Sequence, residues 1–282
     1  MHGLVGRDGW FFYKPDVRFL IEPWTGCDDV VAAVRAFHDA LAARGIRLLV
    51  VPAPGKPSVY PDKITARAAG LDEPVYSHAR ETIARMRQAG VEVVDLFTLF
   101  DQNRATTALY LQQDTHWSPD GMSLAAREVA AQLLARNWVA KGAVDYAFQP
   151  VPIQRHGDVL RMARSPRIEK GFPPEQMQCA QVVHKDTGEP YKDDLDSDVL
   201  VLGDSFLRIY ELDEPGSAGF TAHLARELAK PVASIINDGG ASTLVRQELN
   251  RKPQFLRNKK VVVWEFVERD LRFGTEGWQV VP

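Results

Sequence analysis

The feature that most constrains the fold is an apolar run that ends in a small polar turn. Residues 198–206 read Asp-Val-Leu-Val-Leu-Gly-Asp-Ser-Phe. A continuous apolar run rich in β-branched residues is typical of a strand buried on both faces of a parallel sheet. Open α/β sheets bind their ligands at the carboxyl ends of such strands. We therefore expect Ser205 at that edge as a candidate nucleophile, with its backbone N–H available to stabilise an oxyanion.

A candidate general base lies upstream, where residues 114–119 read Asp-Thr-His-Trp-Ser-Pro. A serine followed by a proline is typical of a helix N-terminus, and apolar residues at helical spacing predict a helix from about 119 to 137. Asp114 and His116 then lie in the loop that enters this helix. There the carboxylate can accept a hydrogen bond from imidazole Nδ1 and leave Nε2 free for a serine hydroxyl. The pattern predicts a Ser-His-Asp triad with Ser205.

Other interpretations of the same residues are weaker. A Gly-Asp-Ser turn or a single histidine is common without any catalytic role. A metal site built from Asp114, His116 and Asp120 would contain only one imidazole, and Asp120 is better explained by a favourable interaction with the helix N-terminus. The triad is therefore favoured, and we expect neither a metal ion nor a cofactor.

The rest of the chain alternates between helical and extended patterns. Strands alternating with helices imply a mostly parallel, doubly wound α/β sheet, and 282 residues suit one large domain. Residues 138–197 form a long connection of weak periodicity with a short hairpin near 178–183, and long connections often shape substrate sites. Helices are predicted at 28–44, 74–90, 216–228 and 242–251, and strands at 46–52, 91–97, 232–236 and 261–267.

Three further features each have a structural and a functional interpretation. The aromatic cluster at 6–13 is more readily a hairpin that closes a core than a platform for a ligand. Lys56 follows a predicted strand and is either a contact to a polar or anionic ligand or a solvated loop residue. Cys27 and Cys179 are either a disulfide or two buried thiols.

Composition excludes some functions. The formal net charge is −3, which gives no basic surface for nucleic acid. No apolar run reaches eighteen residues and the first residues do not form a signal peptide, so no membrane span is predicted. These patterns leave the localisation open, including an N-terminal anchor outside this sequence.

Several segments are similar to one family. Gly203-Asp204-Ser205-Phe206 resembles the nucleophile block of SGNH hydrolases. The sequence at 114–118 resembles the Asp-x-His block of the alginate O-acetyltransferase AlgJ/AlgX-like family, in which that block precedes the nucleophile. Ordinary SGNH esterases have the opposite order. The resemblance extends over nearly the whole chain, because the segments 6–12, 54–57, 238–240 and 263–269 are also similar.

This resemblance implies a fold and a set of site residues. The fold is a single SGNH-hydrolase-like domain over 1–282, a three-layer α/β/α sandwich with a mostly parallel sheet. Ser205 is implied as nucleophile, His116 as general base and then acid, and Asp114 as the residue that orients the imidazole. The Ser205 N–H is one oxyanion donor, and the further candidates are Asn237, Gly239 and Gly240. Candidate contacts to sugar or acetyl oxygens are Lys56, Arg208 and Tyr210, each with an equally open structural role.

The resemblance also implies a function. It indicates a periplasmic or cell-surface enzyme that transfers acetyl groups to hydroxyls of an exported polysaccharide, with the donor supplied by a membrane-bound O-acyltransferase partner. The predicted last strand lies close to Pro282, so we expect no appended carbohydrate-binding domain and an AlgJ-like rather than AlgX-like protein. One alternative is a carbohydrate acetylesterase with the same triad. Another is a non-catalytic polysaccharide-binding or assembly component, suggested by Trp10, Trp117 and Tyr110.

Overall fold

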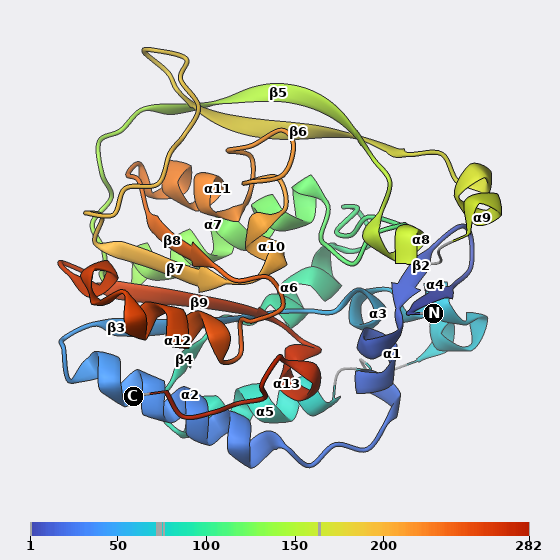
Figure 1. Ribbon diagram of the computed structural model, residues 1–282, viewed down its shortest axis with the longest axis horizontal. Coiled ribbons are helices and arrows are strands. Elements are labelled where there is room, and N and C mark those ends of the chain that lie inside the picture. The colour runs from blue at the N-terminus through green and yellow to red at the C-terminus, as the bar shows by residue number, and fades with distance from the viewer. Residues whose placement is uncertain (1, 72–74, 76, 163–164, 282) are drawn as a thin grey trace.

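A five-stranded parallel sheet forms the centre of the molecule (Figure 1). The computed structural model describes residues 2–71, 75, 77–162 and 165–281. Every neighbouring pair of strands in the sheet runs parallel, which confirms the predicted topology. In spatial order the strands are β4 (Glu92–Val93), β3 (Arg47–Ala53), β9 (Val261–Val267), β7 (Val199–Gly203) and β8 (Ala233–Ile236).

The central strands are buried on both faces. Every residue of β7 and of β9 is buried. Successive side chains of a strand point to opposite faces. Val199 and Val201 accordingly belong to one apolar cluster, and Leu200 and Leu202 to the other. The uninterrupted apolar runs in the sequence therefore reflect a sheet covered on both sides.

Helices form the two outer layers (Figure 1). α7 (Pro119–Ala135) and α11 (Phe220–Leu228) contribute to the cluster on one face. α2 (Cys27–Ala42), α5 (Ser77–Gln88) and α12 (Leu244–Arg251) contribute to the cluster on the other. The structure is thus the expected α/β/α sandwich.

The carboxyl edge of the sheet carries three short helices that directly follow strands. α3 (Lys56–Val59) follows β3, α10 (Ser205–Arg208) follows β7, and α13 (Asp270–Phe273) follows β9. Because the strands are parallel, these helices gather at one edge. The remaining helices are α1 (Lys14–Ile21), α4 (Pro61–Ile64), α6 (Leu96–Asn103), α8 (Asp158–Met162), α9 (Pro166–Gly171) and the 3-10 helices η1 (Ala66–Gly70) and η2 (Pro253–Leu256).

Some predicted boundaries differ from the structure. The strand predicted at 91–97 is wrong beyond Val93, because Asp95 caps α6 by accepting a hydrogen bond of 3.0 Å from Thr98 N. The helices predicted from 216 and 242 begin later, at Phe220 and Leu244. The predicted start of the helix at 74 lies outside the described residues. The start of α7 is confirmed, because Ser118 Oγ accepts from Gly121 N at 3.0 Å.

The long connection contains more regular structure than expected. β5 (Tyr146–Arg155) and β6 (Glu175–His184) pair antiparallel along their full length and form a ribbon over α7 and α11 (Figure 1). The sequence predicts only a short hairpin near 178–183. Pro150 and Pro152 lie within β5, and proline lowers the strand signal because it cannot donate to the ladder.

The structure also decides between the alternatives for the N-terminal aromatic segment and for the two cysteines. β1 (Gly3–Val5) and β2 (Phe11–Tyr13) form the expected hairpin, with Trp10 and Phe12 buried in the core rather than exposed to a ligand. Cys27 and Cys179 are both free and buried, so they are not a disulfide. Among the described residues no helix combines the length and apolar character needed to cross a membrane.

Candidate active site

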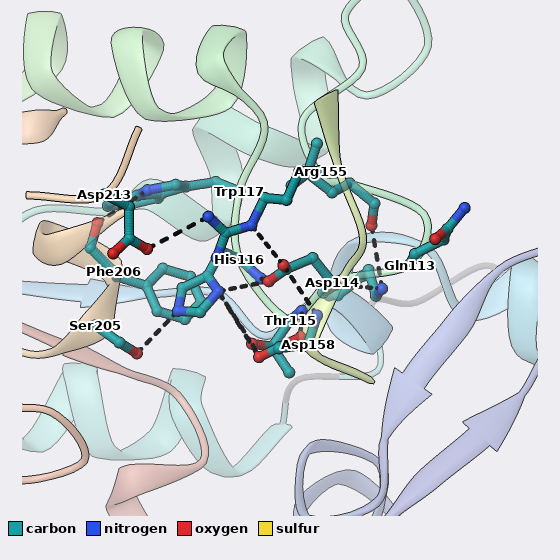
Figure 2. A network of polar contacts seen from close by, with 12 residues as sticks. Gln113, Asp114, Thr115, His116, Trp117, Arg155, Asp158, Ser205, Phe206 and Asp213 are labelled. Atoms are coloured by element: carbon teal, nitrogen blue, oxygen red, sulfur yellow. Dashed lines mark hydrogen bonds and ion pairs between the residues drawn. The ribbon is translucent and has the colours of Figure 1, made fainter. Parts of the chain in front are cut away.

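Asp114, His116 and Ser205 lie in one hydrogen-bonded row (Figure 2). Nδ1 of His116 is 2.6 Å from Asp114 Oδ1, and Nε2 is 2.8 Å from Ser205 Oγ. His116 and Asp114 are buried, whereas Ser205 is partly accessible. The structure therefore brings together the three residues that the sequence pattern singled out, although 89 positions separate His116 from Ser205.

The end of β7 positions the serine. Asp204 Oδ1 caps α10 by accepting from Phe206 N at 2.8 Å. Ser205 is the first residue of the helix, so its N–H has no intrahelical acceptor. A Cβ at Gly203 would lie 2.5 Å from Glu265 Oε2, so the turn packs too tightly for a larger residue. The chain thus presents both Oγ and N–H of Ser205 at the carboxyl edge of the sheet.

Asp114 has more partners than the sequence indicated. Its Oδ1 also accepts from His116 N at 3.2 Å. Its Oδ2 accepts from Arg155 Nε at 3.0 Å and from Asp158 N at 3.1 Å. Sequence reasoning missed Arg155 and Asp158, which lie on the weakly periodic connection at the end of β5 and the start of α8. These donors fix the carboxylate in one orientation.

Asp158 also fixes the loop that carries the histidine. Its Oδ1 accepts from Thr115 N at 2.7 Å and its Oδ2 from Thr115 Oγ1 at 2.6 Å. Asp114, His116 and Asp158 offer ligand atoms within 4.8 Å of one another. All four carboxylate oxygens, however, already accept hydrogen bonds from protein donors, which favours a hydrogen-bonded network over a metal site. Asp120 is exposed in the first turn of α7.

Asp114 and His116 shift each other's pKa in the direction opposite to the shift that burial causes. Burial alone raises the pKa of Asp114, but the charge and hydrogen bond of His116, together with Arg155, hold it well below its ordinary value. Burial alone lowers the pKa of His116, but the Asp114 carboxylate raises it above the ordinary value. Asp114 is therefore an ionised carboxylate, and it increases the basicity of the imidazole.

A second set of contacts joins the histidine loop to α10. Trp117 Nε1 donates to Phe206 O at 3.1 Å, and the Tyr210 hydroxyl donates to Trp117 O at 3.1 Å. The rings of His116 and Phe206 are 4.9 Å apart. Tyr210 is fully buried, so its hydroxyl holds this loop in place. Of the two roles expected for Tyr210, the structure therefore agrees with the structural role and not with a contact to the substrate.

The Lys56 side chain is held inside the protein by backbone carbonyls. It is fully buried, and Nζ donates to three carbonyls: Leu111 O at 3.1 Å, Gln112 O at 3.1 Å and Asp114 O at 2.5 Å. Burial lowers the pKa of this amine to about 8. Lys56 is therefore not a solvated loop residue and is not exposed to a ligand; it anchors the Asp114 loop, which is the structural role that the sequence left open for it.

Arg208 lies near the site in a row of alternating charges. Its Nη1 contacts Asp213 Oδ1 at 2.5 Å and its Nε contacts Asp238 Oδ2 at 2.8 Å. Arg155 Nη1 lies 3.3 Å from the other oxygen of Asp213 (Figure 2). We call this row, Asp114–Arg155–Asp213–Arg208–Asp238, the ion chain. It connects the Asp114 loop to α10 and to the loop after β8.

The candidate oxyanion donors after β8 are partly engaged within the protein. Asn237 Nδ2 donates to Glu248 Oε2 at 3.3 Å, and Gly240 N donates to Asn237 O at 2.9 Å. Gly239 is exposed at the tip of the loop, with a φ of +66° that favours glycine. The Arg208–Asp238 contact holds this loop beside α10.

A parallel α/β/α sandwich with a Ser-His-Asp row at its carboxyl edge is the arrangement of the SGNH hydrolase-like class. The model of the ALGX family, described as an SGNH hydrolase-like domain of acetyltransferase AlgX, matches residues 4–268. The chain belongs to this family of SGNH hydrolase-like acetyltransferases. The predictions of an SGNH-like fold and an acetyltransferase are confirmed at this level.

Individual relatives agree with the family. The chain is 24% identical over 277 residues to the probable alginate O-acetylase AlgJ of Azotobacter vinelandii, and the aligned region covers 95% of this chain and 69% of the relative. It is 26% identical over 289 residues to the probable alginate O-acetylase AlgJ of Pseudomonas aeruginosa, covering 97% and 71%. The solved O-acetyltransferase domain of Pseudomonas putida AlgJ superposes with a TM-score of 0.75 at 24% identity, covering 95% of this chain and 91% of that one.

Proposed function

We propose that this protein transfers acetyl groups to hydroxyls of an exported polysaccharide through an acetyl ester on Ser205. The observation that carries the proposal is the contact of His116 Nε2 with Ser205 Oγ at 2.8 Å, with Nδ1 held on Asp114 at 2.6 Å. This is the geometry in which an oriented imidazole activates a serine. Membership of an acetyltransferase family, and relatives named as alginate O-acetylases, support acetyl as the group transferred and a polysaccharide as acceptor.

In the first half of the reaction Ser205 takes the acetyl group. His116 Nε2 removes the Oγ proton as Oγ attacks the acetyl carbonyl, and the negative charge on the carbonyl oxygen faces the Ser205 N–H. The same imidazole then returns the proton to the departing oxygen of the donor. Asp114 stabilises the transient imidazolium and keeps the protonated nitrogen on its own side.

In the second half a sugar hydroxyl attacks the acetyl-serine. His116 now accepts the proton of that hydroxyl, and the collapse of the tetrahedral intermediate returns a proton to Ser205 Oγ. The products are an acetylated sugar and free enzyme. Since His116 performs every proton transfer, the proposal requires no cofactor. If water replaces the sugar, the same steps describe an acetylesterase.

The proposal includes a setting for the enzyme. Transfer to an exported polysaccharide places the protein in the periplasm or at the cell surface, as a single SGNH-like domain over 1–282. We propose a membrane-bound O-acyltransferase as the source of the acetyl group, on the basis of the family resemblance of the sequence. The partly accessible Ser205 agrees with delivery of the acetyl group from outside the domain.

Intact-protein mass spectrometry tests the proposal. The protein is incubated with p-nitrophenyl acetate, with and without an oligosaccharide acceptor. We expect an acetyl adduct or ester turnover that is lost in Ser205→Ala and His116→Ala and retained in Ser123→Ala. Ser123 is a matched control, because it lies on α7 away from the row.

The products then decide between transfer and hydrolysis. Acetylated oligosaccharide supports the transferase, whereas turnover that no acceptor diverts from water indicates an esterase. No adduct and no turnover in a folded protein would remove the acetyl-serine from the mechanism.

A further inference from the structure

Arg269 is a cation near the nucleophile that the reaction proposed above does not use. It lies two residues beyond β9, just as Ser205 lies two residues beyond the neighbouring parallel strand β7. Its guanidinium carbon is 5.9 Å from the centre of the Phe206 ring. The same Phe206 ring lies 4.9 Å from the ring of His116 (Figure 2). One side chain therefore contacts both Arg269 and the catalytic histidine.

A buried carboxyl holds one end of this guanidinium. Arg269 Nη1 donates to Asp16 Oδ1 at 3.1 Å, and Asp16 is buried. The Nε and Nη2 groups make no hydrogen bond with the described residues, and they are not fully buried. The Arg269 side chain is 13% exposed. Because an arginine carries five N–H donors in a planar fork, the contact with Asp16 fixes the group and leaves donors open to a ligand.

The charge of Arg269 is less neutralised than that of the other arginines near the row. Within the described part of the chain Arg269 contacts one carboxylate, whereas Arg155 and Arg208 contact two each. Its neighbours in the sequence, Glu268 and Asp270, do not add negative charge at pH 7, because burial raises the pKa of each to about 8. An anionic group that enters the site therefore meets an available positive charge.

Tyr13 adds a second polar group beside Arg269. The guanidinium carbon lies 5.3 Å from the centre of the Tyr13 ring. Tyr13 is half-buried, and its hydroxyl makes no hydrogen bond with the described residues and is not fully buried. A phenol both donates and accepts hydrogen bonds, so it can pair with a carboxylate or with a sugar hydroxyl.

A carboxylate is the ligand group that suits this arrangement. The planar fork of arginine matches the two oxygens of a carboxylate, and hydrogen bonds between the two charged groups are stronger than neutral ones. The formal net charge of the chain is −3, so the protein as a whole does not attract a polyanion. Selection of an acidic polymer therefore needs a local cation near Ser205.

We infer that Arg269, together with Tyr13, binds a carboxylate of the acceptor polysaccharide and makes the enzyme select a polyuronate over a neutral chain. The inference rests on the proposed function, and it assigns acceptor selection to particular residues. It agrees with the names of the relatives, since each sugar of alginate carries a carboxylate.

Binding to the Ser205→Ala variant tests the inference without any chemistry. Calorimetric titrations use a β-1,4-mannuronate hexamer and a β-1,4-mannose hexamer, which differ only in their carboxylates. We expect the mannuronate to bind about tenfold more tightly at low salt. Equal or weaker binding of mannuronate, or no binding of either hexamer, overturns the inference. This comparison leaves Arg269 unchanged, so it does not depend on the folding of an Arg269 variant.

Substitutions in the Ser205→Ala background then assign the preference to residues. Arg269→Met should lower the affinity for mannuronate about tenfold and leave that for mannose unchanged. Arg269→Lys keeps the charge but not the planar fork and should retain part of the affinity. Tyr13→Phe keeps the ring against Arg269 and should lower the affinity for mannuronate about threefold, because it loses one hydrogen bond.

Arg272→Met is the matched control for the loss of a positive charge. Arg272 lies on α13, three residues beyond Arg269, and contacts Glu22 at 3.0 Å. Its variant should bind mannuronate as tightly as the parent. Equal losses in Arg269→Met and Arg272→Met, or no loss in Arg269→Met, contradict the inference. An unchanged affinity in Tyr13→Phe excludes the phenol from this site.

These binding results are distinguishable from failure of the proposed function. The proposed function fails if Ser205-dependent acetyl chemistry is absent, whatever binds beside Arg269. The inference fails if mannuronate has no advantage over mannose, whatever Ser205 does with p-nitrophenyl acetate.

Discussion

Two groups of ionisable residues meet at the turn that presents Ser205, and they handle charge in opposite ways. The ion chain alternates acids and bases, so each of its carboxylates contacts an arginine. The second group, which we call the acid cluster, contains five buried acids around Arg269: Asp16, Asp204, Glu265, Glu268 and Asp270. Arg269 contacts Asp16 at 3.1 Å, and Glu265 Oε2 accepts from Asp204 N at 3.3 Å.

The comparison shows how the number of partners determines the ionisation of a buried carboxyl. Asp114 keeps its charge because four donors, two of them on the basic side chains of His116 and Arg155, outweigh its burial. In the acid cluster burial dominates, and it raises the pKa of Glu268 and of Asp270 to about 8. One oxygen of each of Asp204, Glu265, Glu268 and Asp270 has no hydrogen-bond partner among the described residues. The ion chain therefore maintains the catalytic charge, whereas Glu268 and Asp270 of the acid cluster hold protons at neutral pH.

Removing the charge from Asp114 should have the largest effect. Asp114→Asn keeps the shape of the side chain but loses the anion that orients and stabilises the imidazolium. We expect the rate of Ser205 acetylation to fall about 10⁴-fold, measured from the release of p-nitrophenol. Asp120→Asn, an exposed site on α7, is the matched control and should remain close to wild type. A fall of less than tenfold in Asp114→Asn would show that His116 does not depend on this carboxylate.

Breaking the next link of the ion chain should have a smaller effect. Arg155→Met removes a donor to Asp114 Oδ2 but leaves His116 Nδ1 on Oδ1. We expect kcat to fall roughly 10- to 100-fold, because the pair loses its fixed orientation, and KM to change less. Arg155→Lys keeps the charge and should restore part of kcat.

Arg226→Met is the control for the loss of an arginine along the ribbon, since Arg226 packs on the Phe148 ring of β5. Equal losses in the Arg155 and Arg226 variants would indicate a general defect of the ribbon and not a role in orienting Asp114.

The sequence alone predicted some of these elements and site residues but not others. The strands β7 and β9 were predictable because each is a continuous run of apolar residues. The helix α7 was predictable because its apolar residues recur at helical spacing. The row of Asp114, His116 and Ser205 was predictable because Ser205 directly follows a recognisable strand, and Asp114 and His116 directly precede a recognisable helix start. Arg155 was not, since its partner Asp114 lies 41 positions away and β5 contains two prolines.

Lys56 and Tyr210 are residues that the sequence offered as substrate contacts and that the structure buries. Lys56 follows a central strand, and the family resemblance offered both side chains as contacts to sugar or acetyl oxygens. Their burial depends on carbonyls that only the folded chain brings near, from Leu111 to Asp114 for Lys56 and from Trp117 for Tyr210. A side chain's position in the sequence indicated the correct edge of the sheet but not whether the group faces solvent.

The test of the acid cluster concerns stability and not rate. The folded pKa of Glu268 is about 8, far above the ordinary value of about 4.5, so the folded state holds one more proton than the unfolded state between these pH values. The free energy of unfolding should therefore fall as pH rises from about 4.5 to 8, by at most about 1.4 kcal/mol per pH unit for this group. Glu268→Gln does not titrate and should lose less stability over that range in urea unfolding at pH 5 and pH 8.

The amide oxygen of the introduced glutamine can still accept from Gly55 N and Ser58 Oγ, the partners of Glu268. Glu189→Gln, at an exposed position, is the control and should follow the wild-type dependence on pH. The same pH dependence in Glu268→Gln as in wild type would mean that Glu268 is ionised in the folded protein.

The position of β9 has a consequence for how the protein acquires its structure. β9 is the last strand in the sequence, yet it lies in the middle of the sheet, between β3 and β7. The early strands β3 and β4 and the later strands β7 and β8 therefore have no shared ladder until residues 261–267 have been synthesised. A chain emerging from the ribosome cannot close this sheet before residues 261–267 are available, so its two halves are joined only when the last of the five strands has been made.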